Sequence, residues 1–469
     1  MAGILLARRQ ACHRLVTPLI NLNYLNHNRL GPRSGRRNIS EETILKRVAN
    51  RLVTTAVYGF TICALSYSLP SFGADVTASP TPDGKEIKNV VTPPKPPEPR
   101  FKLYGWIEGG ITVNPDTPND NHNFGHLFTD RANEPLLNQV SIVGERALDP
   151  NVTGFDWGFK VWVMEGSDAR YDKAAGWFDL MTNDRIQFDI PEAYASFHVP
   201  IPSTGGLDLR LGHFQDLSSA ETTDPRTNVF YSHSYIFNFG IPLTHLGGLG
   251  ILHVNKLVDL YFGVDRGTNL AFKDNNHSIA IEAGFGLNLL DGNLTVLALS
   301  HIGPEDAGNN HDYRFENDMT TTWKINKCLT SITDLNLIYD ELTPAWGGGA
   351  AQYFTYAVND WLTLGIRGEI WRDANNFFVG QFRANNDFIH LVRGDPVAPD
   401  PSTFTGGKTT YLEVTGGVTI KPPMPKPIAG LSIRPEVRYD RALTTNTKPF
   451  DQLTDRDQWT FGIDVVLQF

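Results

Sequence analysis

The last twelve residues of the chain, 458–469, read QWTFGIDVVLQF. Every second residue from Trp459 to Phe469 is aromatic or aliphatic, and the residues between them are polar or small except for Val466. Because successive side chains of a β-strand point to opposite faces, this strand has one apolar and one polar face. A half-buried strand of a soluble sheet would show the same alternation. Aromatic residues at both ends of the apolar face favour a membrane-crossing strand, because aromatic girdles border the lipid-facing band of such strands.

The composition leaves room for membrane-spanning strands and excludes a bundle of membrane-spanning helices. The chain has 469 residues, of which 41% are hydrophobic, and a mean hydropathy of −0.25. After residue 80 there is no apolar run of the roughly 18 residues that a transmembrane helix requires. Spanning strands escape a hydropathy scan because apolar and polar residues alternate along them.

The N-terminal part of the chain has the pattern of an export signal. Three basic residues between 46 and 51 precede an apolar stretch at 52–69, and small residues follow. We therefore expect residues 1–74 to be an N-terminal extension and signal peptide, cleaved after Gly73 or Ala74. A membrane anchor helix is the alternative.

Two further segments follow the predicted signal peptide. Residues 75–100 are polar and proline-rich, which predicts a disordered, extended lead-in. Residues 101–469 form the predicted β-domain. Among the chain's cysteines only Cys328 lies beyond residue 74, so the exported chain has no intrachain disulfide and no cysteine metal site.

The charge of the exported chain limits its partners. The first 74 residues hold 10 of the 41 Lys and Arg and 2 of the 51 Asp and Glu, which leaves 31 basic and 49 acidic residues and a formal charge of −18. This balance disfavours nucleic acid and anionic membrane surfaces as partners. Inside a wide pore the same balance would favour cations.

From residue 101 onward, alternating segments of strand length are separated by turn residues, which predicts an all-β fold. Outer-membrane barrels alternate short periplasmic turns with long external loops. A strand at 231–240 would break this alternation, whereas one long loop at 215–246 restores it and places both ends of the barrel on the periplasmic side. The predicted strands number 16: 101–113, 136–146, 154–164, 186–198, 206–214, 247–254, 257–265, 278–289, 292–301, 317–325, 328–340, 350–358, 361–372, 408–420, 430–440 and 457–469. We therefore predict a transmembrane antiparallel up-and-down β-barrel that is wide enough for an aqueous lumen.

The sequence contains none of the common catalytic motifs. No G-x-S-x-G, H-E-x-x-H or P-loop pattern occurs, so we expect neither an enzyme nor a cofactor. The Asn- and Asp-rich stretch at 114–123 offers oxygen ligands for calcium or for bridging to lipopolysaccharide, but a solvated external loop is the simpler interpretation. Histidines are spread over strands and a loop, and we expect rim or loop residues rather than metal ligands: His198, His213, His233, His245 and His253.

Several short patches resemble the OmpL-like beta-barrel porin family of bacteria. The chain also ends on Phe469, as many bacterial outer-membrane barrels do. The resemblance extends over 100–469 and implies an outer-membrane porin-like barrel, without assigning a solute or a catalytic residue. A lysine is expected at the position of His213, so no specific role is carried over to this residue. The patches are Pro191-Glu192-Ala193-Tyr194, Leu211-Gly212-His213-Phe214, Ser232-His233-Ser234-Tyr235-Ile236, Pro242-Leu243-Thr244-His245-Leu246-Gly247, Arg434-Pro435-Glu436-Val437-Arg438-Tyr439-Asp440 and the terminal strand.

The segment 215–246 is the third external loop by this count. In 16-stranded porins that loop folds into the lumen and sets the constriction, so it is the main candidate site. We expect a polar first half that faces the pore and an aromatic second half that packs on the wall, and a surface loop with a short hairpin is the alternative. The first half carries Asp216, Glu221, Asp224 and Arg226, and the second half carries Phe230, Tyr231, Tyr235, Phe237 and Phe239.

Charged residues on the polar faces of the strands complete the candidate site. Opposed basic and acidic rows in a channel create a transverse field that discriminates ions. Simple pairing of these charges across neighbouring strands is the alternative. The residues expected to line the pore are Arg210, Arg367, Glu369, Arg434, Glu436, Arg438 and Asp464.

The leading hypothesis is a passive aqueous channel for small hydrophilic solutes or ions, with a preference for cations. It would lie among outer-membrane lipids and lipopolysaccharide, and a homotrimer is one option. The alternative is an outer-membrane barrel with a non-channel role, as a surface enzyme or a structural or adhesive protein. A soluble secreted β-solenoid or sandwich is a third option, whereas a 22-stranded transporter with a plug would need a longer chain.

Overall fold

The fold is taken from a computed structural model of the chain. The predicted signal peptide and nearly all of the predicted lead-in lie outside the residues that the structure describes, as does most of the predicted loop at 373–407. The described residues are 100–149, 152–179, 185–201, 203, 205–380, 408–444 and 446–469.

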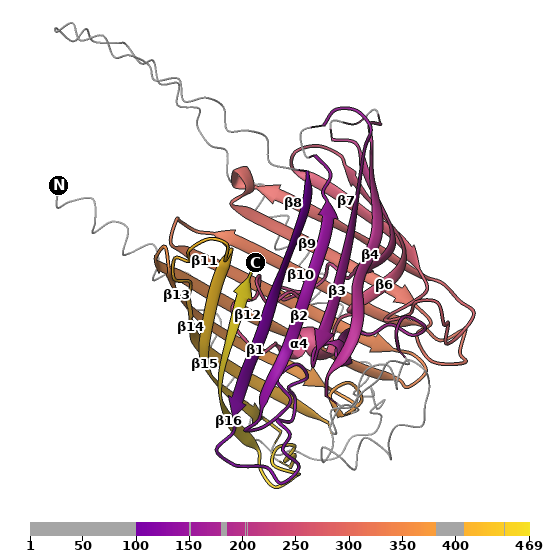
Figure 1. Ribbon diagram of the computed structural model, residues 1–469. Coiled ribbons are helices and arrows are strands. Elements are labelled where there is room, and N and C mark those ends of the chain that lie inside the picture. The colour runs from indigo at the N-terminus through magenta and orange to yellow at the C-terminus, as the bar shows by residue number, and fades with distance from the viewer. Residues whose placement is uncertain are drawn as a thin grey trace, which may run out of the picture. The chain divides into compact units, whose positions relative to one another are not determined.

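Sixteen antiparallel strands form one closed barrel, in which each strand pairs with its neighbours in the sequence (Figure 1). In the described parts of the connections there are three short helical segments: α3 (Ala169–Asp172), α4 (Tyr235–Phe239) and η1 (Leu290–Gly292). No helix in the described part of the chain has the length and apolarity needed to cross a membrane. The strands are β1 (Phe101–Val113), β2 (Pro135–Arg146), β3 (Asp156–Gly166), β4 (Gln187–Val199), β5 (Leu207–Gln215), β6 (Thr244–His253), β7 (Val258–Asp265), β8 (Ala280–Leu289), β9 (Leu294–Gly303), β10 (Arg314–Lys324), β11 (Leu329–Asp340), β12 (Ala345–Asn359), β13 (Leu362–Asp373), β14 (Thr409–Ile420), β15 (Gly430–Ala442) and β16 (Asp457–Gln468).

The first and last strands close the barrel. Gly105 and Phe469 exchange two backbone hydrogen bonds of 3.0 Å, and further along the seam Gly110 pairs with Asp464. A closed ladder satisfies the backbone N–H and C=O groups that hydrocarbon cannot satisfy. All sixteen predicted strands are confirmed, including the closure of the last strand against the first.

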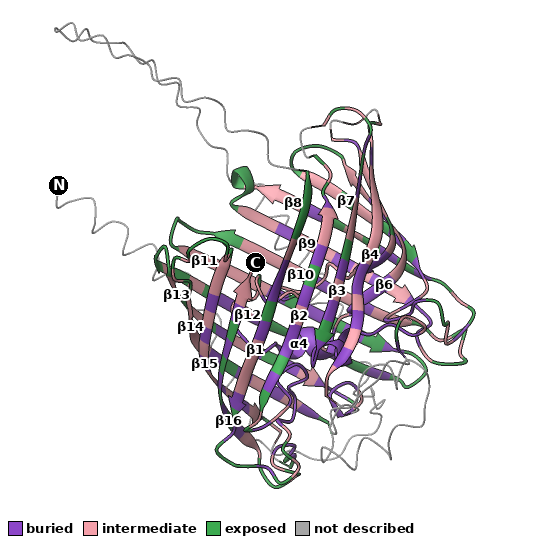
Figure 2. Ribbon diagram, viewed as in Figure 1, coloured by how far each residue is buried: buried purple, intermediate pink, exposed green. Residues whose placement is uncertain are grey.

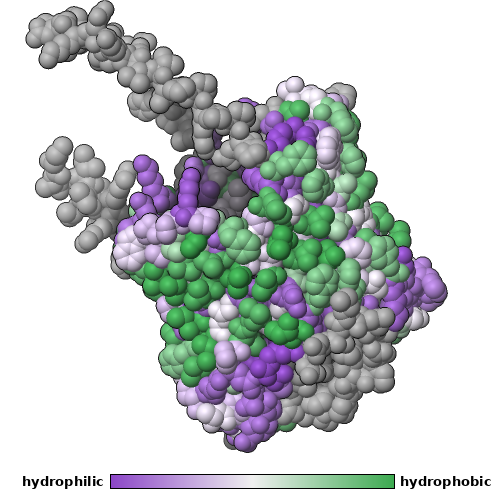
Figure 3. Space-filling view, viewed as in Figure 1, coloured by the Kyte–Doolittle hydropathy of each residue, from purple (hydrophilic) through white to green (hydrophobic). Residues whose placement is uncertain are grey.

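The alternation that is visible in the sequence separates the two faces of the wall. In β16, Trp459, Phe461 and Ile463 are exposed on the outer face, whereas Thr460 and Asp464 are buried on the inner face. Figure 2 shows the same alternation of buried and exposed residues along several strands. On the face drawn in Figure 3, hydrophobic residues gather in a band across the wall, with hydrophilic residues toward both ends.

The largest difference from the predicted boundaries is in β12, which starts at Ala345 rather than at residue 350. The glycines at 347–349 suggested a loop, but in the barrel they allow close packing. A Cβ atom at Gly349 would lie 2.2 Å from the backbone oxygen of Ile370 in β13. A strand glycine here marks a close approach of two backbones rather than the end of the strand.

Proline in β15 affects one of the two ladders that the strand makes. Pro435 pairs with Ile463 of β16, so β15 is continuous. On the other side, the pairing with β14 stops at Glu436 and resumes only at Ile433. Because proline has no N–H to donate, a local break is expected at this position, and it occurs on the β14 side alone.

We expect the substitution Ile463→Arg, in the middle of the outer face of β16, to destabilise the barrel by about 2–4 kcal/mol, because a cation is costly at the bilayer midplane. Urea unfolding in lipid vesicles measures this change. Leu103→Arg, on the outer face nearer the rim, should cost only about 0–1 kcal/mol. Equal costs at the two positions would contradict the assignment of the outer face.

Candidate functional site

Loop L3, residues 216–243, joins β5 to β6 and crosses the inside of the barrel. It contacts β10, β11, β13 and β15 through hydrogen bonds. In the closed order of sixteen strands, β13 is eight positions away from β5, so it lies on the opposite side of the wall. The predicted insertion of the third external loop into the lumen is therefore confirmed.

Acidic side chains on the inner wall bind the backbone of L3. Glu436 of β15 accepts hydrogen bonds from the N–H groups of Tyr231 and Ser232 at 2.8 and 3.1 Å. On β11, Asp334 accepts the N–H of Ala220 at 2.8 Å, and Asp318 of β10 accepts the N–H of Ser219 at 2.9 Å. An irregular loop has backbone donors without a strand partner, and these carboxylates satisfy them.

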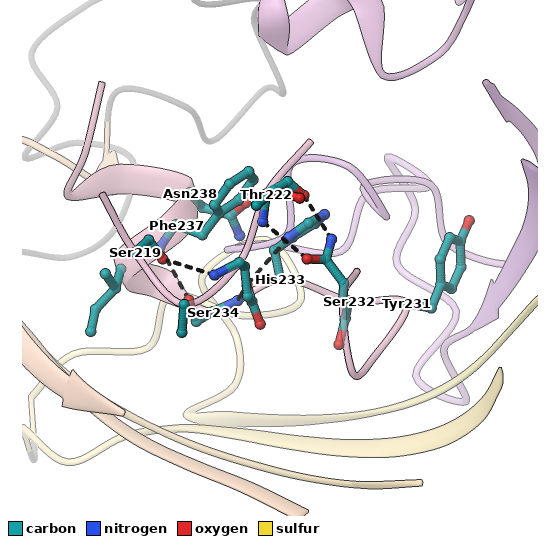
Figure 4. Close-up of polar contacts among 12 residues, drawn as sticks. Ser219, Thr222, Tyr231, Ser232, His233, Ser234, Phe237 and Asn238 are labelled. Carbon is teal, nitrogen blue, oxygen red and sulfur yellow. Dashed lines mark hydrogen bonds and ion pairs between the residues drawn. The ribbon is translucent and has the colours of Figure 1, made fainter. Parts of the chain in front are cut away.

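The short helix α4 is fixed in the same way. Ser234 caps the helix by accepting a hydrogen bond of 3.1 Å from the N–H of Phe237 (Figure 4). Glu369 of β13 accepts the N–H groups of Tyr235 and Ile236 at 2.7 and 2.8 Å. Side-chain oxygens thus satisfy donors at the start of the helix that have no partner within it.

Arginines on the inner wall bind the carbonyl groups of L3. Arg367 donates to the carbonyl of Ser232 at 2.8 Å, and Arg438 donates to the carbonyl of His233 at 2.5 Å. Arg434 donates to the carbonyl of Pro225 at 2.8 Å. The arginines and carboxylates that alternate on the inner face of β15 therefore match the alternating acceptors and donors of a peptide backbone.

The same arginines also pair with carboxylates of the wall, as the alternative interpretation expects. Arg434 forms an ion pair with Asp464 across the β15–β16 ladder, and Arg367 forms one with Glu413 of β14. Arg367 also reaches Glu221 of L3 at 2.6 Å. Burial alone would raise the pKa of Glu221, but the charge of Arg367 and hydrogen bonding to His233 hold it well below its usual range.

Six of the predicted pore-lining residues thus lie beneath L3. All six point inward, as the alternation predicts, and none is more than 9% exposed. Their contacts are with the loop and with one another, and a role in lining the conduction path stays a prediction. They are Arg367, Glu369, Arg434, Glu436, Arg438 and Asp464.

The aromatic half of L3 packs against the wall, as expected. The ring of His233 stacks on Phe237 at 4.3 Å and contacts Phe128 at 4.8 Å. Phe128 belongs to the loop between β1 and β2, in which most of the stretch 114–123 is exposed or half-buried, as expected, whereas residues 124–130 are buried. The buried aromatic residues of L3 are Phe230, Tyr231, Tyr235, Phe237 and Phe239.

The polar half of L3 faces a cavity of about 330 Å³, which we call the loop–wall cavity. Asp216, Glu221 and Asp224 line it from the loop, and Arg210 of β5 lines it from the wall. The structure therefore brings four of the predicted site residues together. Arg226 lies beside them, where it pairs with Asp224 at 2.5 Å and lies over the ring of Trp106.

A second cavity, of about 180 Å³, adjoins the first. Lys160, Tyr194 and Arg210 line both cavities, so the two lie next to each other along β3, β4 and β5. Arg146 and Asp208 line only the second cavity. Two neighbouring cavities with charged linings therefore lie between L3 and this part of the wall.

Sequence reasoning did not select Lys160 or Glu192, which form an ion pair in the loop–wall cavity. Both lie on inner faces of predicted strands, so the alternation could have pointed to them. Their neighbours in the sequence did not distinguish these two residues from other charged residues on the inner faces of strands.

The family model described as "Putative beta-barrel porin-2, OmpL-like" matches residues 100–469. No curated protein sequence matches the chain.

Three solved outer-membrane structures have a similar chain path, and each covers 79% of this chain. The channel DcaP of Acinetobacter baumannii has 11% identity, 97% coverage of its own chain and a TM-score of 0.46. OprB of Pseudomonas putida has 10% identity, 94% coverage of its own chain and a TM-score of 0.48. An anion-selective porin from Comamonas acidovorans has 10% identity, 99% coverage of its own chain and a TM-score of 0.47.

The family of the chain follows from the match to the family model, because the three solved structures are too dissimilar in sequence and in TM-score to show it. The closed barrel of sixteen strands agrees with this family description. The chain belongs to the OmpL-like family of beta-barrel porins and is a channel-type barrel of the bacterial outer membrane.

Proposed function

We propose that the chain forms a passive aqueous channel for small hydrophilic solutes, and that the path runs along β3, β4 and β5 past the polar half of L3. The adjoining cavities on this side of the barrel carry the proposal. The aromatic half of L3 packs on the opposite side of the wall, where its side chains are buried. Solutes would therefore pass between the loop and one part of the wall.

We further propose that the channel prefers cations. The two cavities are lined by Glu145, Glu192, Asp208, Asp216, Glu221 and Asp224, but by only three basic residues, Arg146, Lys160 and Arg210. Acidic side chains that line a pore attract cations and repel anions. The formal charge of the exported chain has the same sign.

A homotrimer would fit the outer wall. A hollow of about 360 Å³ on β8–β11 is lined in part by Ala283, Ala298 and polar side chains. Ser300 donates a hydrogen bond of 2.7 Å to Asn317 on this outward face. Small and polar residues are unusual where a wall contacts only lipid, and they suit contact with another protein surface. A second copy of this chain is the proposed occupant.

Planar-bilayer recording tests the channel and its preference for cations. We expect stepwise conductance and a reversal potential that favours potassium over chloride in a KCl gradient. Asp224→Asn should weaken this preference and Arg210→Gln should strengthen it, because each removes one charge from the path. Lys256→Gln, in the exposed turn between β6 and β7, serves as the control. Absence of conductance steps would refute the channel, and a preference for chloride would refute the selectivity.

The substitution Glu369→Gln tests whether the wall carboxylates hold L3 in place. Glutamine has only one acceptor oxygen for the N–H groups of Tyr235 and Ile236, and an unsatisfied buried N–H costs about 1–3 kcal/mol. We expect a looser loop, seen as a larger and noisier single-channel conductance. Glu341→Gln is the matched control, because Glu341 is an exposed residue that accepts one loop N–H. An unchanged conductance in Glu369→Gln would count against this anchoring role.

The trimer is tested by light scattering of the purified protein in detergent. We expect three times the chain mass for the unmodified protein. Ala298→Trp, which fills the hollow, should shift the mass toward that of a monomer. Val161→Trp, on the exposed outer face of β3, should leave the trimer intact. A monomeric unmodified protein would exclude this proposal without affecting the channel.

A further inference from the structure

Two histidines and a carboxylate meet inside the barrel, next to Asp216 at the start of L3. His245 lies on β6, Asp265 on β7 and His301 on β9. Each offers a ligand atom, and these atoms all lie within 4.8 Å of one another. The three residues are 56 or fewer positions apart in sequence, but only the curvature and register of four neighbouring strands bring them together.

The distances suit a small divalent ion. Oδ1 of Asp265 lies 3.1 Å from Nε2 of His301 and 3.6 Å from Nδ1 of His245. Bonds of about 2.1 Å in tetrahedral geometry place neighbouring ligand atoms roughly 3.4 Å apart. The two observed distances lie on either side of this value, so small side-chain movements would complete the arrangement.

Each histidine uses its other ring nitrogen as metal-binding histidines do. Nε2 of His245 lies 3.0 Å from Oδ2 of Asp216, and Nδ1 of His301 lies 3.2 Å from Oε2 of Glu316. A carboxylate in this position orients the imidazole and makes its free nitrogen a better ligand. Both imidazoles are thereby held with one nitrogen toward Asp265.

Several atoms around Asp265 lack hydrogen-bond partners within the described part of the chain. They are Nδ1 of His245, Oδ2 of Asp265 and Oε1 of Glu282. The three residues are 0%, 4% and 2% exposed. Glu282 is opposite His301 in the β8–β9 register. Buried polar atoms are usually satisfied, so a group of unsatisfied ligand atoms points to a missing partner.

The charge of the cluster also calls for a cation. Five buried carboxylates surround the two imidazoles, and among the described residues none of the five forms an ion pair with lysine or arginine. Even with both histidines protonated, the carboxylates are in excess. Buried charges without compensation are costly, and a divalent ion would offset this cost. The five are Asp216, Asp265, Glu282, Glu305 and Glu316.

We propose that His245, Asp265 and His301 bind one divalent transition-metal ion, with Glu282 beside them as a fourth ligand. Two imidazoles and carboxylate oxygens favour zinc and similar ions over calcium or magnesium. The site would also join L3 to the wall, because Asp216 is the first residue of the loop and its N–H donates to the carbonyl of Leu243 at 2.9 Å. The metal would therefore help to hold the start of L3 against β6 through Asp216 and His245.

Zinc titration of the purified full-length barrel tests this site. The protein is freed of metal with a chelator in detergent, and binding of zinc chloride is followed by calorimetry. We expect one zinc per chain and no comparable binding of calcium. His301→Gln should abolish zinc binding, and Asp216→Asn should weaken it about 10–100-fold through loss of the orienting carboxylate.

His253→Gln is the matched control, because His253 also lies between two carboxylates, Asp259 and Asp208, but is not part of the cluster. Circular dichroism checks that each variant retains the barrel. If His301→Gln does not fold, Asp216→Asn decides the outcome. The proposal is wrong if the unmodified barrel binds no zinc, or if His253→Gln lowers zinc binding as much as the cluster variants do.

Discussion

Pairing between the charged inner wall and the backbone of L3 is the interaction on which the interior depends. A loop inside a barrel is neither paired with a strand nor surrounded by bulk solvent, so its N–H and C=O groups need other partners. Glu369 and Glu436 accept from pairs of loop N–H groups, and Arg367, Arg434 and Arg438 donate to loop carbonyls. Without them the loop would pay the full cost of unsatisfied buried groups.

This interaction also explains why so many charges can be buried together. The arginines bind carboxylates of the wall and carbonyls of the loop at the same time, so each charge has several partners. Buried ion pairs are stabilising only when such additional hydrogen bonds offset their desolvation. Along β3–β5 the polar half of L3 does not pack closely on the wall, and the charges there line cavities instead.

The strands could be predicted because apolar and polar residues alternate along each strand, according to whether they face lipid or the lumen. In β16 the alternation is broken only at Val466, and in β12 it is lost at the glycines 347–349, which have no side chains to show it. The insertion of L3 followed from counting loops. The docking of charges on L3 could not be predicted, because Arg434 and Glu436 have the same pattern whether they face water or a peptide backbone. His245 and His301 could not be connected either, since their proximity arises from strand register.

Arg434 shows how the seam of the barrel is held from within. This side chain on β15 binds Asp464 on β16, Glu108 on β1 and the carbonyl of Pro225 in L3. At Gly110 of β1, the missing side chain leaves space for the ring of Tyr231. The first and last strands therefore meet beside a loop from the middle of the chain. The closure of the barrel and the position of the loop therefore depend on one shared side chain, and a barrel without the loop would keep the ion pairs of Arg434 with Asp464 and Glu108 but would lose its contact with Pro225.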